Sequence, residues 1–378
     1  MTALQINSEI SSFAFSLFKE FPTNTNLIFS PASIYLVLAM TSIGSNTETL
    51  QEFKNVLGFE NPKQFAQQVR DATQILLDQS QGVQTKIANK IYYGFTNLDE
   101  EYQKIMQESF SSSIEQVDFQ KDYELSRVKI NKWVESVTND RVKDLIQPDS
   151  LSPSTLMVLV NAIYFNGKFD KQFPKYDTQK REFNVSDNSK VLVDLMLVEN
   201  EYPFFENESY QYVQIPYKGK QFMMEIILPK EDYTLSEVEE NLTLQNLLNL
   251  RQNANEIKID LGLPKFKIEY QTSKILKGIL NKLGLKKCFQ ADADFSSMSK
   301  NNSIFIDDIV QKSVIEVNEE GAEAAAATYA QIVFSSARIS ECKKPKVLCT
   351  RPFLYTISHK PSGQILFIGR MKNPIQNQ

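Results

Sequence analysis

The chain contains one histidine, His359, so chemistry that depends on an imidazole has a single candidate. Nucleophilic catalysis of the Ser-His-Asp kind needs a histidine beside the attacking hydroxyl. His359 follows a predicted strand, Phe353 to Ser358, and precedes a tight turn, which is typical of an ordinary strand-end residue. The sequence contains no G-x-S-x-G, Walker, G-x-G-x-x-G or H-E-x-x-H motif. We therefore do not expect the protein to be an enzyme.

The residues that could ligate a metal also lack a suitable pattern. Asp292 and Asp294 are separated by one residue and precede Phe295, an arrangement more typical of a loop or helix cap than of a metal pair. The three cysteines form no C-x-x-C and cannot all pair with one another; they are Cys288, Cys342 and Cys349. We expect no metal and no cofactor.

Composition excludes several classes of partner. The chain of 378 residues has 41 basic and 46 acidic side chains, a formal net charge of -5, which argues against nucleic acid as a partner. No segment approaches the roughly 20 apolar residues of a membrane span, and we expect no membrane partner. The first residues show no secretion leader. We therefore expect a cytoplasmic protein, with release by a non-classical route left open.

The two halves of the chain predict different elements. Up to about residue 150, helices are predicted at Ser33 to Thr41, Thr47 to Val56, Pro62 to Leu77, Asp99 to Ser111 and Asp122 to Thr138, with one strand at Thr85 to Tyr93. From about residue 155, strands are predicted at Leu156 to Phe165, Tyr210 to Pro216, Phe222 to Leu228, Glu256 to Leu263, Phe353 to Ser358 and Gln364 to Arg370. No Pro- or Gly-rich linker separates the halves. This order indicates one α+β domain with mostly antiparallel strands.

The segment between residues 311 and 353 is unusual. Ser313 to Val317 alternates like a strand, and Glu319 to Thr328 then contains four consecutive alanines, Ala324 to Ala327. About thirty residues separate this strand from the next, near Lys346, and connections of such length are usually functional or disordered. The alanines also favour a helix. Their small side chains would let the segment enter a sheet without steric cost on either face.

Several blocks in sequence order resemble the serpin family. Near the N-terminus, Asn26 to Ile34 reads NLIFSPASI, which is similar to the family's N-x-[IV]-F-S-P-x-S-I. The segment VIEVNEEGAEAAAAT, Val314 to Thr328, resembles the family's hinge signature. Further similar blocks are LVNAIYFNGKFDKQF at Leu159 to Phe173, IPYKGKQFMMEIILP at Ile215 to Pro229, LGLPKFKIEY at Leu261 to Tyr270, LKGILNKLGLKKCFQADADFSSMS at Leu276 to Ser299, and RPFLYTISHKPSGQILFIGRMKNP at Arg351 to Pro374. One departure is Phe169, where the family usually has tryptophan.

The resemblance implies a single serpin domain over residues 1–378, with three β-sheets, about eight or nine helices and an exposed reactive loop at about residues 319–345. It implies a suicide-substrate inhibitor of serine proteases. When a protease cleaves the loop, the loop inserts into the large sheet and carries the acyl-linked enzyme with it. The implied partner is a chymotrypsin-like or trypsin-like protease held in a covalent acyl complex, and the implied oligomeric state is a monomer.

By this resemblance, ten residues form the hinge that enters the sheet first. They are Glu319, Glu320, Gly321, Ala322, Glu323, Ala324, Ala325, Ala326, Ala327 and Thr328. Ala322 matches the first buried position, where a charged or bulky side chain would slow insertion. Since this segment keeps its small residues, the sequence indicates an inhibitor.

The scissile bond has more than one candidate. The resemblance places it sixteen residues beyond Glu319, at Ser335, and its neighbourhood offers a chymotrypsin-like site at Phe334-Ser335. Ser335-Ser336 would suit an elastase-like pocket weakly, and Arg338-Ile339 would suit a trypsin-like enzyme. A longer tether would compress the protease less, which favours Phe334 or Ser335 over Arg338.

The resemblance also implies a polar cluster that helps the central strands separate: Ser30, Ser33, Asn161 and Gln311. The family usually has histidine at the position of Gln311, although glutamine can also hydrogen-bond to Asn161 or a serine hydroxyl. Simple hydrogen-bond satisfaction of buried groups is the alternative role of this cluster.

Two further functions stay open. One is a non-inhibitory binding or chaperone-like serpin, against which the alanines argue; the other is cross-class inhibition of a cysteine protease. The helix near Val69 to Leu77 lacks a basic stripe, so we do not expect heparin to activate the protein.

Overall fold

The structure is a computed structural model that describes residues 3–74, 82–110, 114–272, 275–300, 303–319 and 344–376. The N-terminal part of the chain is mainly helical, as its apolar spacing predicts. The helices in this part are α1 (Ala3–Glu20), α2 (Pro31–Ser42), α3 (Thr47–Leu57), α4 (Pro62–Thr73), α5 (Glu100–Phe110) and α6 (Phe119–Val137). Later helices are α7 (Leu235–Asn241), α8 (Leu244–Asn253) and α9 (Ile275–Leu283), with 3-10 turns η2 (Lys175–Asp177) and η3 (Lys287–Phe289). The described residues thus contain nine α-helices, within the expected range.

One sheet has five strands and contains the segment that leads into the unusual connection. Its order is β10 (Phe266–Gln271), β11 (Asp308–Val317), β4 (Met157–Gly167), β2 (Val83–Tyr93) and β3 (Ile114–Gln116). β10 pairs antiparallel with β11, and β2 pairs antiparallel with β4. The central pair, β11 and β4, is parallel. Most other pairings are antiparallel, as expected, apart from β2 with β3 and β12 with β9.

The second sheet has nine strands. These are β1 (Leu27–Phe29), β14 (Ile365–Met371), β13 (Phe353–His359), β8 (Phe222–Pro229), β7 (Tyr210–Pro216), β6 (Ser189–Glu206), β9 (Asn255–Pro264) and β12 (Lys346–Leu348), with β5 (Gln179–Ser186) paired to β6. β6 is 18 residues long; residues 189–195 pair with β5, residues 195–204 pair with β9, and residues 204–206 pair with β7. The three expected sheets are therefore present as two hydrogen-bonded sheets, because β6 belongs to two of the three.

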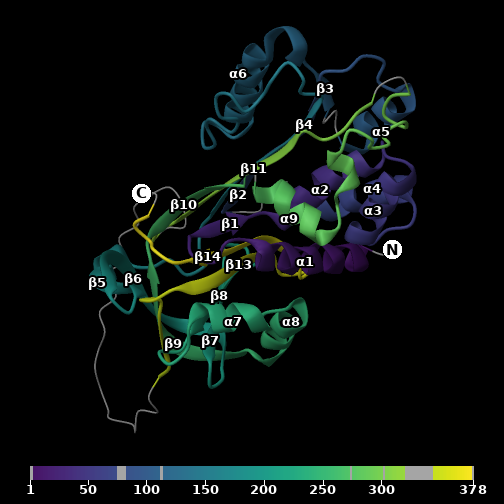
Figure 1. The fold of residues 1–378 in the computed structure, drawn as a ribbon. Helices are drawn as coiled ribbons and strands as arrows, with labels where there is room; N and C mark the ends of the chain where they lie inside the picture. The colour runs from purple at the N-terminus through teal and green to yellow at the C-terminus, as the bar shows by residue number, and fades with distance from the viewer. Residues whose placement is uncertain are drawn as a thin grey trace, which may run out of the picture.

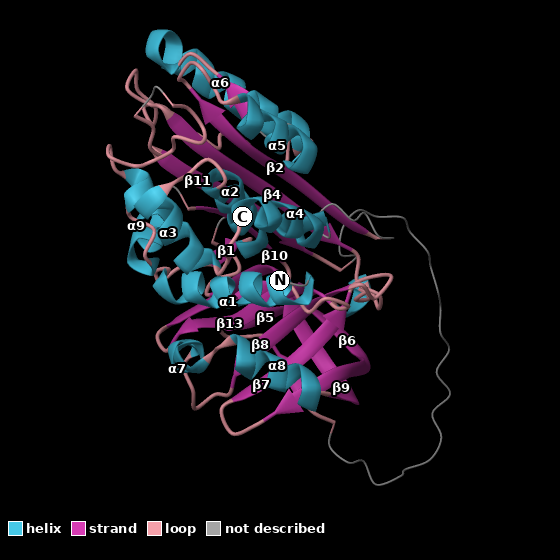
Figure 2. Ribbon diagram, turned by 90° about the vertical axis from the view of Figure 1, so that its right-hand side faces the viewer, coloured by secondary structure: helices cyan, strands magenta, loops and turns pink. Residues whose placement is uncertain are grey.

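The helices cover the five-stranded sheet on both faces. Figure 1 shows α6 on one side of β2, β4 and β11, and α1 to α5 with α9 on the other side. Figure 2 shows α7 and α8 beside β7 and β8 of the other sheet. A small core lies between α6 and one face of the five-stranded sheet, with Ile130 and Val134 of α6 packed among Val158, Val160 and Val314. A larger core fills the space on the opposite face.

Burial on both faces explains the sequences of two central elements. Every residue of β4 is buried, and its run MVLVNAIYFNG is almost continuously apolar, as expected of a strand covered on both faces. α2 is buried nearly all around and has Pro31 at its first turn, where a missing N–H costs nothing. The side chain of Ser30 caps this helix by accepting a hydrogen bond from Ser33 N at 3.4 Å. This cap places Ser30 and Ser33 directly beneath the five-stranded sheet.

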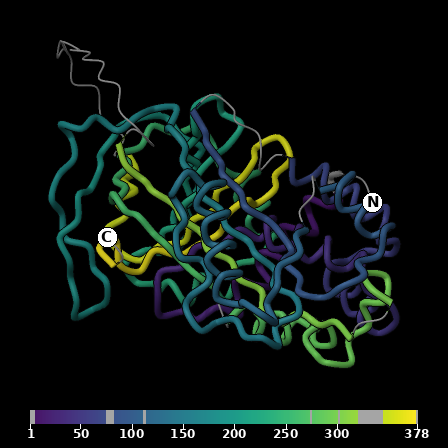
Figure 3. Tube along the Cα trace, turned by 90° about the horizontal axis from the view of Figure 1, so that it is seen from above, coloured from purple at the N-terminus to yellow at the C-terminus, as the bar shows by residue number. Residues whose placement is uncertain are grey.

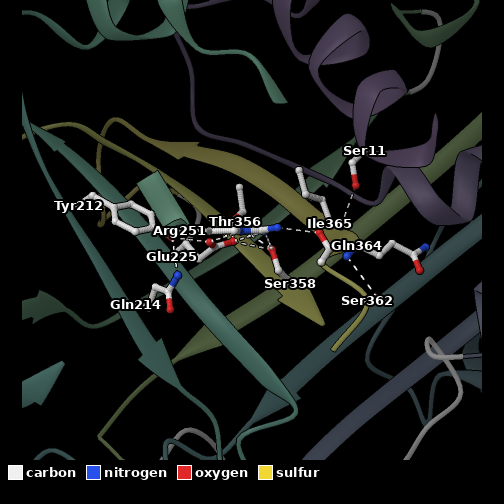
Figure 4. A network of polar contacts seen from close by, with 11 residues as sticks. Ser11, Tyr212, Gln214, Glu225, Arg251, Thr356, Ser358, Ser362, Gln364 and Ile365 are labelled. Carbon is white, nitrogen blue, oxygen red and sulfur yellow. Dashed lines mark hydrogen bonds and ion pairs between the residues drawn. The ribbon is translucent and has the colours of Figure 1, made fainter. Parts of the chain in front are cut away.

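A buried ion pair joins α8 to the nine-stranded sheet (Figure 4). Arg251 of α8 donates to both carboxylate oxygens of Glu225 on β8, at 2.8 and 2.7 Å. Glu225 also accepts hydrogen bonds from Tyr212, Thr356 and Ser358. Burial raises the pKa of Glu225, but the charge and hydrogen bonds of Arg251, with those of the hydroxyls, lower it to about 2. The carboxylate is therefore charged at neutral pH.

Candidate functional site

Most of the predicted reactive segment lies outside the described residues. This applies to the hinge from Glu320 through Gly321, Ala322, Glu323, Ala324, Ala325, Ala326 and Ala327 to Thr328, and to the bond candidates Phe334, Ser335, Ser336, Arg338 and Ile339. Glu319, the first hinge residue, is described. The structure therefore locates the two ends of the segment and the sheet beside its first end.

The boundary between β11 and β4 is the point where the five-stranded sheet could accept another strand. Eight residue pairs are in parallel register, from Asp308 opposite Val158 to Ile315 opposite Phe165. β11 ends at Val317, two residues before Glu319. A chain that turned back at Glu319 would run antiparallel to both neighbours. Insertion would therefore replace one parallel pairing with two antiparallel pairings, which are slightly more stable per residue.

Three amide side chains lie in one row across this boundary. Asn89 of β2 is in register with Asn161 of β4, which is in register with Gln311 of β11. Ser30 and Ser33 lie beneath the row, at the start of α2. The structure therefore brings together all four predicted residues of the polar cluster and adds Asn89. We call these five residues the polar row.

The side chain of Gln311 on β11 forms hydrogen bonds with Asn161 on β4 and with Ser30 at the start of α2. Its Nε2 donates to Asn161 Oδ1 at 2.7 Å and to the carbonyl oxygen of Ser30 at 3.0 Å. Its Oε1 accepts from the backbone N–H of Ser30 at 3.1 Å. Both amide hydrogens are used, and the side chain is fully buried. Only the bond to Asn161 crosses to β4, so Gln311 could keep its Ser30 partners when the strands separate.

On the other side of the boundary, Asn161 is held independently of Gln311. Its Nδ2 donates to Ser33 Oγ at 2.5 Å and to Asn89 Oδ1 at 2.7 Å. Ser33 Oγ in turn donates to Asn89 Oδ1 at 2.9 Å. The Asn89 Nδ2 atom is buried without a partner among the described residues. Sequence reasoning missed Asn89, although an amide at an inward position of a mostly buried strand was a usable indication.

Glu319 lies two residues beyond the end of β11 and is held in place by three contacts. Its carboxylate accepts from Thr178 Oγ1 at 3.0 Å and pairs with Lys265 Nζ at 3.0 Å, and its carbonyl accepts from Phe173 N at 3.1 Å. Burial raises the pKa of Glu319, but its backbone hydrogen bond, Lys265 and Thr178 lower it further than burial raises it. The net pKa is below the ordinary value. No spacing in the sequence indicated these partners, which are far from Glu319 in the chain.

The other end of the segment returns to the nine-stranded sheet. Lys344 forms ion pairs with Glu199 of β6 and with Asp260 of β9, the second at 3.1 Å. The Asp260 N–H donates to the carbonyl of Pro345 at 3.1 Å, and β12 then pairs in parallel with β9. Both ends are therefore anchored by side chains and backbone together.

The residues considered for other chemistry have structural partners. His359 Nδ1 lies 2.9 Å from Ser362 Oγ in the turn between β13 and β14. Asp294 accepts from Thr47 Oγ1 and Ser296 Oγ, and Asp292 pairs with Lys287. Within the described ranges there is no group of three or more His, Cys, Asp or Glu side chains that could hold a metal ion. None of the helices in these ranges has the length and hydropathy to cross a membrane.

Comparison with known proteins assigns the family. The model of the serpin family, serine protease inhibitors, matches residues 8–374. Serpin B3 of Homo sapiens is 36% identical, covering 96% of this chain and 98% of its own. Antichymotrypsin-2 of Bombyx mori is 35% identical over 95% of each chain.

Solved structures agree. Uncleaved ovalbumin matches with a TM-score of 0.87 and 26% identity, over 98% of this chain and all of its own. Serpin48 of Tenebrio molitor matches with a TM-score of 0.85 and 31% identity, over 98% of each chain. The chain therefore belongs to the serpin family and has the serpin fold.

Proposed function

We propose that this serpin is a suicide-substrate inhibitor of serine proteases and that residues 1–378 act as one inhibitory domain. The observation that carries the proposal is the direct parallel pairing of β11 with β4, next to a connection rich in alanine. This pairing supports a sheet that has not yet received the segment, and the alanines at Ala324 to Ala327 would enter it with little steric cost.

The chemistry needs only the target's own catalytic groups. The protease serine hydroxyl attacks the carbonyl carbon of the scissile residue, and the peptide bond to the next residue breaks. The new amino terminus leaves with a proton, and an ester joins the inhibitor to the protease. Insertion must then move the ester-linked enzyme before water hydrolyses the ester.

The energy of insertion is adequate for this purpose. Sixteen strand residues at about 3.3 Å each would carry the enzyme about 50 Å. If each residue gains a net ~1 kcal/mol from hydrogen bonding, insertion releases on the order of 10–20 kcal/mol. This is comparable to the ~5–15 kcal/mol that stabilises a typical folded protease. Insertion could therefore distort the captured enzyme.

The target is a chymotrypsin-like protease if Phe334-Ser335 is cleaved, and a trypsin-like protease if Arg338-Ile339 is cleaved. The spacing from Glu319 favours Phe334 or Ser335 over Arg338, and of these two Phe334 is the chymotrypsin-like site. We further propose that the protein acts as a cytoplasmic monomer, with no nucleic-acid or heparin partner. Within the polar row, Ser30, Ser33, Asn161 and Gln311 would control how readily the sheet opens.

Heat resistance after loop cleavage tests the proposal. A protease that nicks the loop without being trapped should yield a form whose melting temperature is far above that of the intact protein, because the inserted strand adds hydrogen bonds to the sheet. An unchanged melting temperature after nicking would instead assign the protein to the non-inhibitory members of the family. A raised melting temperature without inhibition of any serine protease would direct the search to cysteine proteases.

A further inference from the structure

A hollow of about 940 Å³ lies against strands β5, β6, β9 and β12, and no step of the proposed mechanism uses it. A backbone hydrogen bond of 2.8 Å from Asn184 N to the Thr350 carbonyl joins β5 to the chain just after β12 and closes one side of the hollow. In Figure 3 the teal segment that contains β5 and β6 lies on the side of the molecule opposite the N-terminus.

The floor of the hollow is apolar because a glycine permits three leucines to converge. A Cβ atom on Gly262 of β9 would lie 2.9 Å from Leu348 Cδ2 and 3.1 Å from the Cδ2 atoms of Leu195 and Leu197. No larger residue would fit without displacing them. Leu192, which also lines the hollow, is 64% exposed. An apolar floor with an exposed leucine at its margin is suited to receive an apolar side chain from outside.

Two cations at this surface lack an acidic partner within the described part of the chain. Lys190 pairs with Glu182, and Glu199 pairs with Lys258 and Lys344, so most charges that line the hollow neutralise one another. Arg181 donates to the amide oxygen of Gln179, and neither Lys346 nor Asp177, which also lines the hollow, forms an ion pair among these residues. Two unpaired cations against one unpaired carboxylate leave an excess of positive charge, which favours an apolar side chain that has a carboxylate nearby.

The hollow lies between the two anchors of the reactive segment. Glu319 is held by Thr178, the residue directly before β5, and Lys344 is held by Glu199 and Asp260, which line the hollow. A protein bound to a bond between these anchors is thereby held close to the surface formed by β5, β6, β9 and β12. We therefore expect the target protease to be the partner that occupies the hollow.

We propose that this hollow is a second contact surface for the target protease and binds a surface loop with an apolar side chain beside a carboxylate. The proposal rests on the proposed function and adds a determinant of target choice outside the scissile bond. It predicts that the intact protein binds the protease more tightly than the reactive segment does alone.

Reversible binding tests this surface apart from trapping. The probes are chymotrypsin and trypsin with the catalytic serine replaced by alanine, and a synthetic peptide of residues 319–343 represents the segment alone. The test variants are Leu192→Ala and the double variant Arg181→Glu/Lys346→Glu. Matched controls are Leu125→Ala, which is also 64% exposed but lies on α6, and Lys121→Glu on the same helix. Because the substituted side chains are exposed, melting temperatures should stay at the wild-type value.

We expect the wild-type protein to bind at least one probe more tightly than the peptide, and each test variant to weaken that binding by about fivefold or more. The controls should bind as wild type. Variants that bind both probes as wild type does would overturn the proposal. A second outcome would also overturn it. If the test variants changed the rate at which thermolysin cleaves the segment as much as they changed probe binding, the hollow would contact the chain's own segment instead.

The two proposals can fail separately. If active proteases form no covalent complex but the inactive probes still respond to the test variants, the inhibitory mechanism is wrong and the contact surface stands. If covalent complexes form at the same rate in every variant, the mechanism stands and the contact surface is wrong.

Discussion

Gln311 Nε2 donates a hydrogen bond of 2.7 Å to Asn161 Oδ1 across the boundary between β11 and β4, where the proposed insertion would open the sheet. Among the described residues of the polar row, this is the one side-chain hydrogen bond that joins β11 directly to β4. Each partner has other hydrogen bonds on its own side, Gln311 to Ser30 and Asn161 to Ser33 and Asn89. Opening therefore breaks one bond of this network and leaves the rest in place.

Replacing Gln311 with leucine should lower the free energy of unfolding by about 1–3 kcal/mol, because it leaves buried groups of Asn161 and Ser30 without partners. The sheet should also open more easily, so insertion of the uncleaved loop or polymer formation on mild heating should become faster. Urea unfolding and native electrophoresis measure the two effects. Gln311→His is the control, since histidine can still hydrogen-bond to Asn161. A leucine variant as stable as wild type would contradict this role of Gln311.

Substitutions in the hinge should separate inhibition from cleavage. We expect Ala322→Arg to turn the protein into a substrate, because a charged side chain would have to be buried during insertion. Since side chains alternate between the two faces of a strand, Glu323→Arg lies on the opposite face and should inhibit nearly as well as wild type. The number of inhibitor molecules consumed per protease molecule inactivated measures the difference. Equal values for the two variants would contradict insertion in this register.

The anchor at Glu319 should depend on pH. Because its folded-state pKa lies below the unfolded value, its charge stabilises the fold fully above the unfolded pKa, and this contribution is lost as pH falls through the folded pKa. The stability difference between wild type and Glu319→Gln should therefore be constant near neutral pH and shrink below about pH 4.5. Denaturant unfolding across this range measures it. A difference that grows on acidification would mean that the carboxylate is not stabilised by Lys265 and Thr178.

The buried pair of Glu225 and Arg251 should show strong coupling. Either Glu225→Gln or Arg251→Met alone should cost about 3–5 kcal/mol, because the single substitution leaves an unpaired buried charge. The double variant should cost much less than the two single variants together. Urea unfolding of the wild type, the two single variants and the double variant gives the coupling free energy between the two side chains. Additive costs would show that the two side chains act independently.

Local patterns predicted most of the elements near the candidate site. Apolar spacing predicted α2 and α3 to within about two residues, and the β-branched run at Leu156 to Phe165 became β4. The long hairpin of β5 and β6 was not predicted, because its outer strand is mostly polar and exposed and lacks a clear alternation. The burial of only one of its residues, Phe183, explains this composition.

The site itself was predicted only where a motif marked it. Family resemblance located Ser30, Ser33, Asn161 and Gln311, and the structure places them in contact. The partners Asn89 and Lys265 depend on strand register and on contacts between distant segments, which local sequence does not encode. Interactions of this kind required the folded structure.

The most direct test of the central claim is to mix the protein with chymotrypsin and with trypsin, followed by denaturing electrophoresis and mass spectrometry of the released C-terminal peptide. We predict a complex that survives denaturation with one of the two enzymes. A peptide beginning at Ser335 would assign cleavage after Phe334, one beginning at Ser336 cleavage after Ser335, and one beginning at Ile339 cleavage after Arg338. Complete cleavage by both enzymes, with no complex and with full protease activity remaining, would contradict inhibition of these proteases by loop insertion.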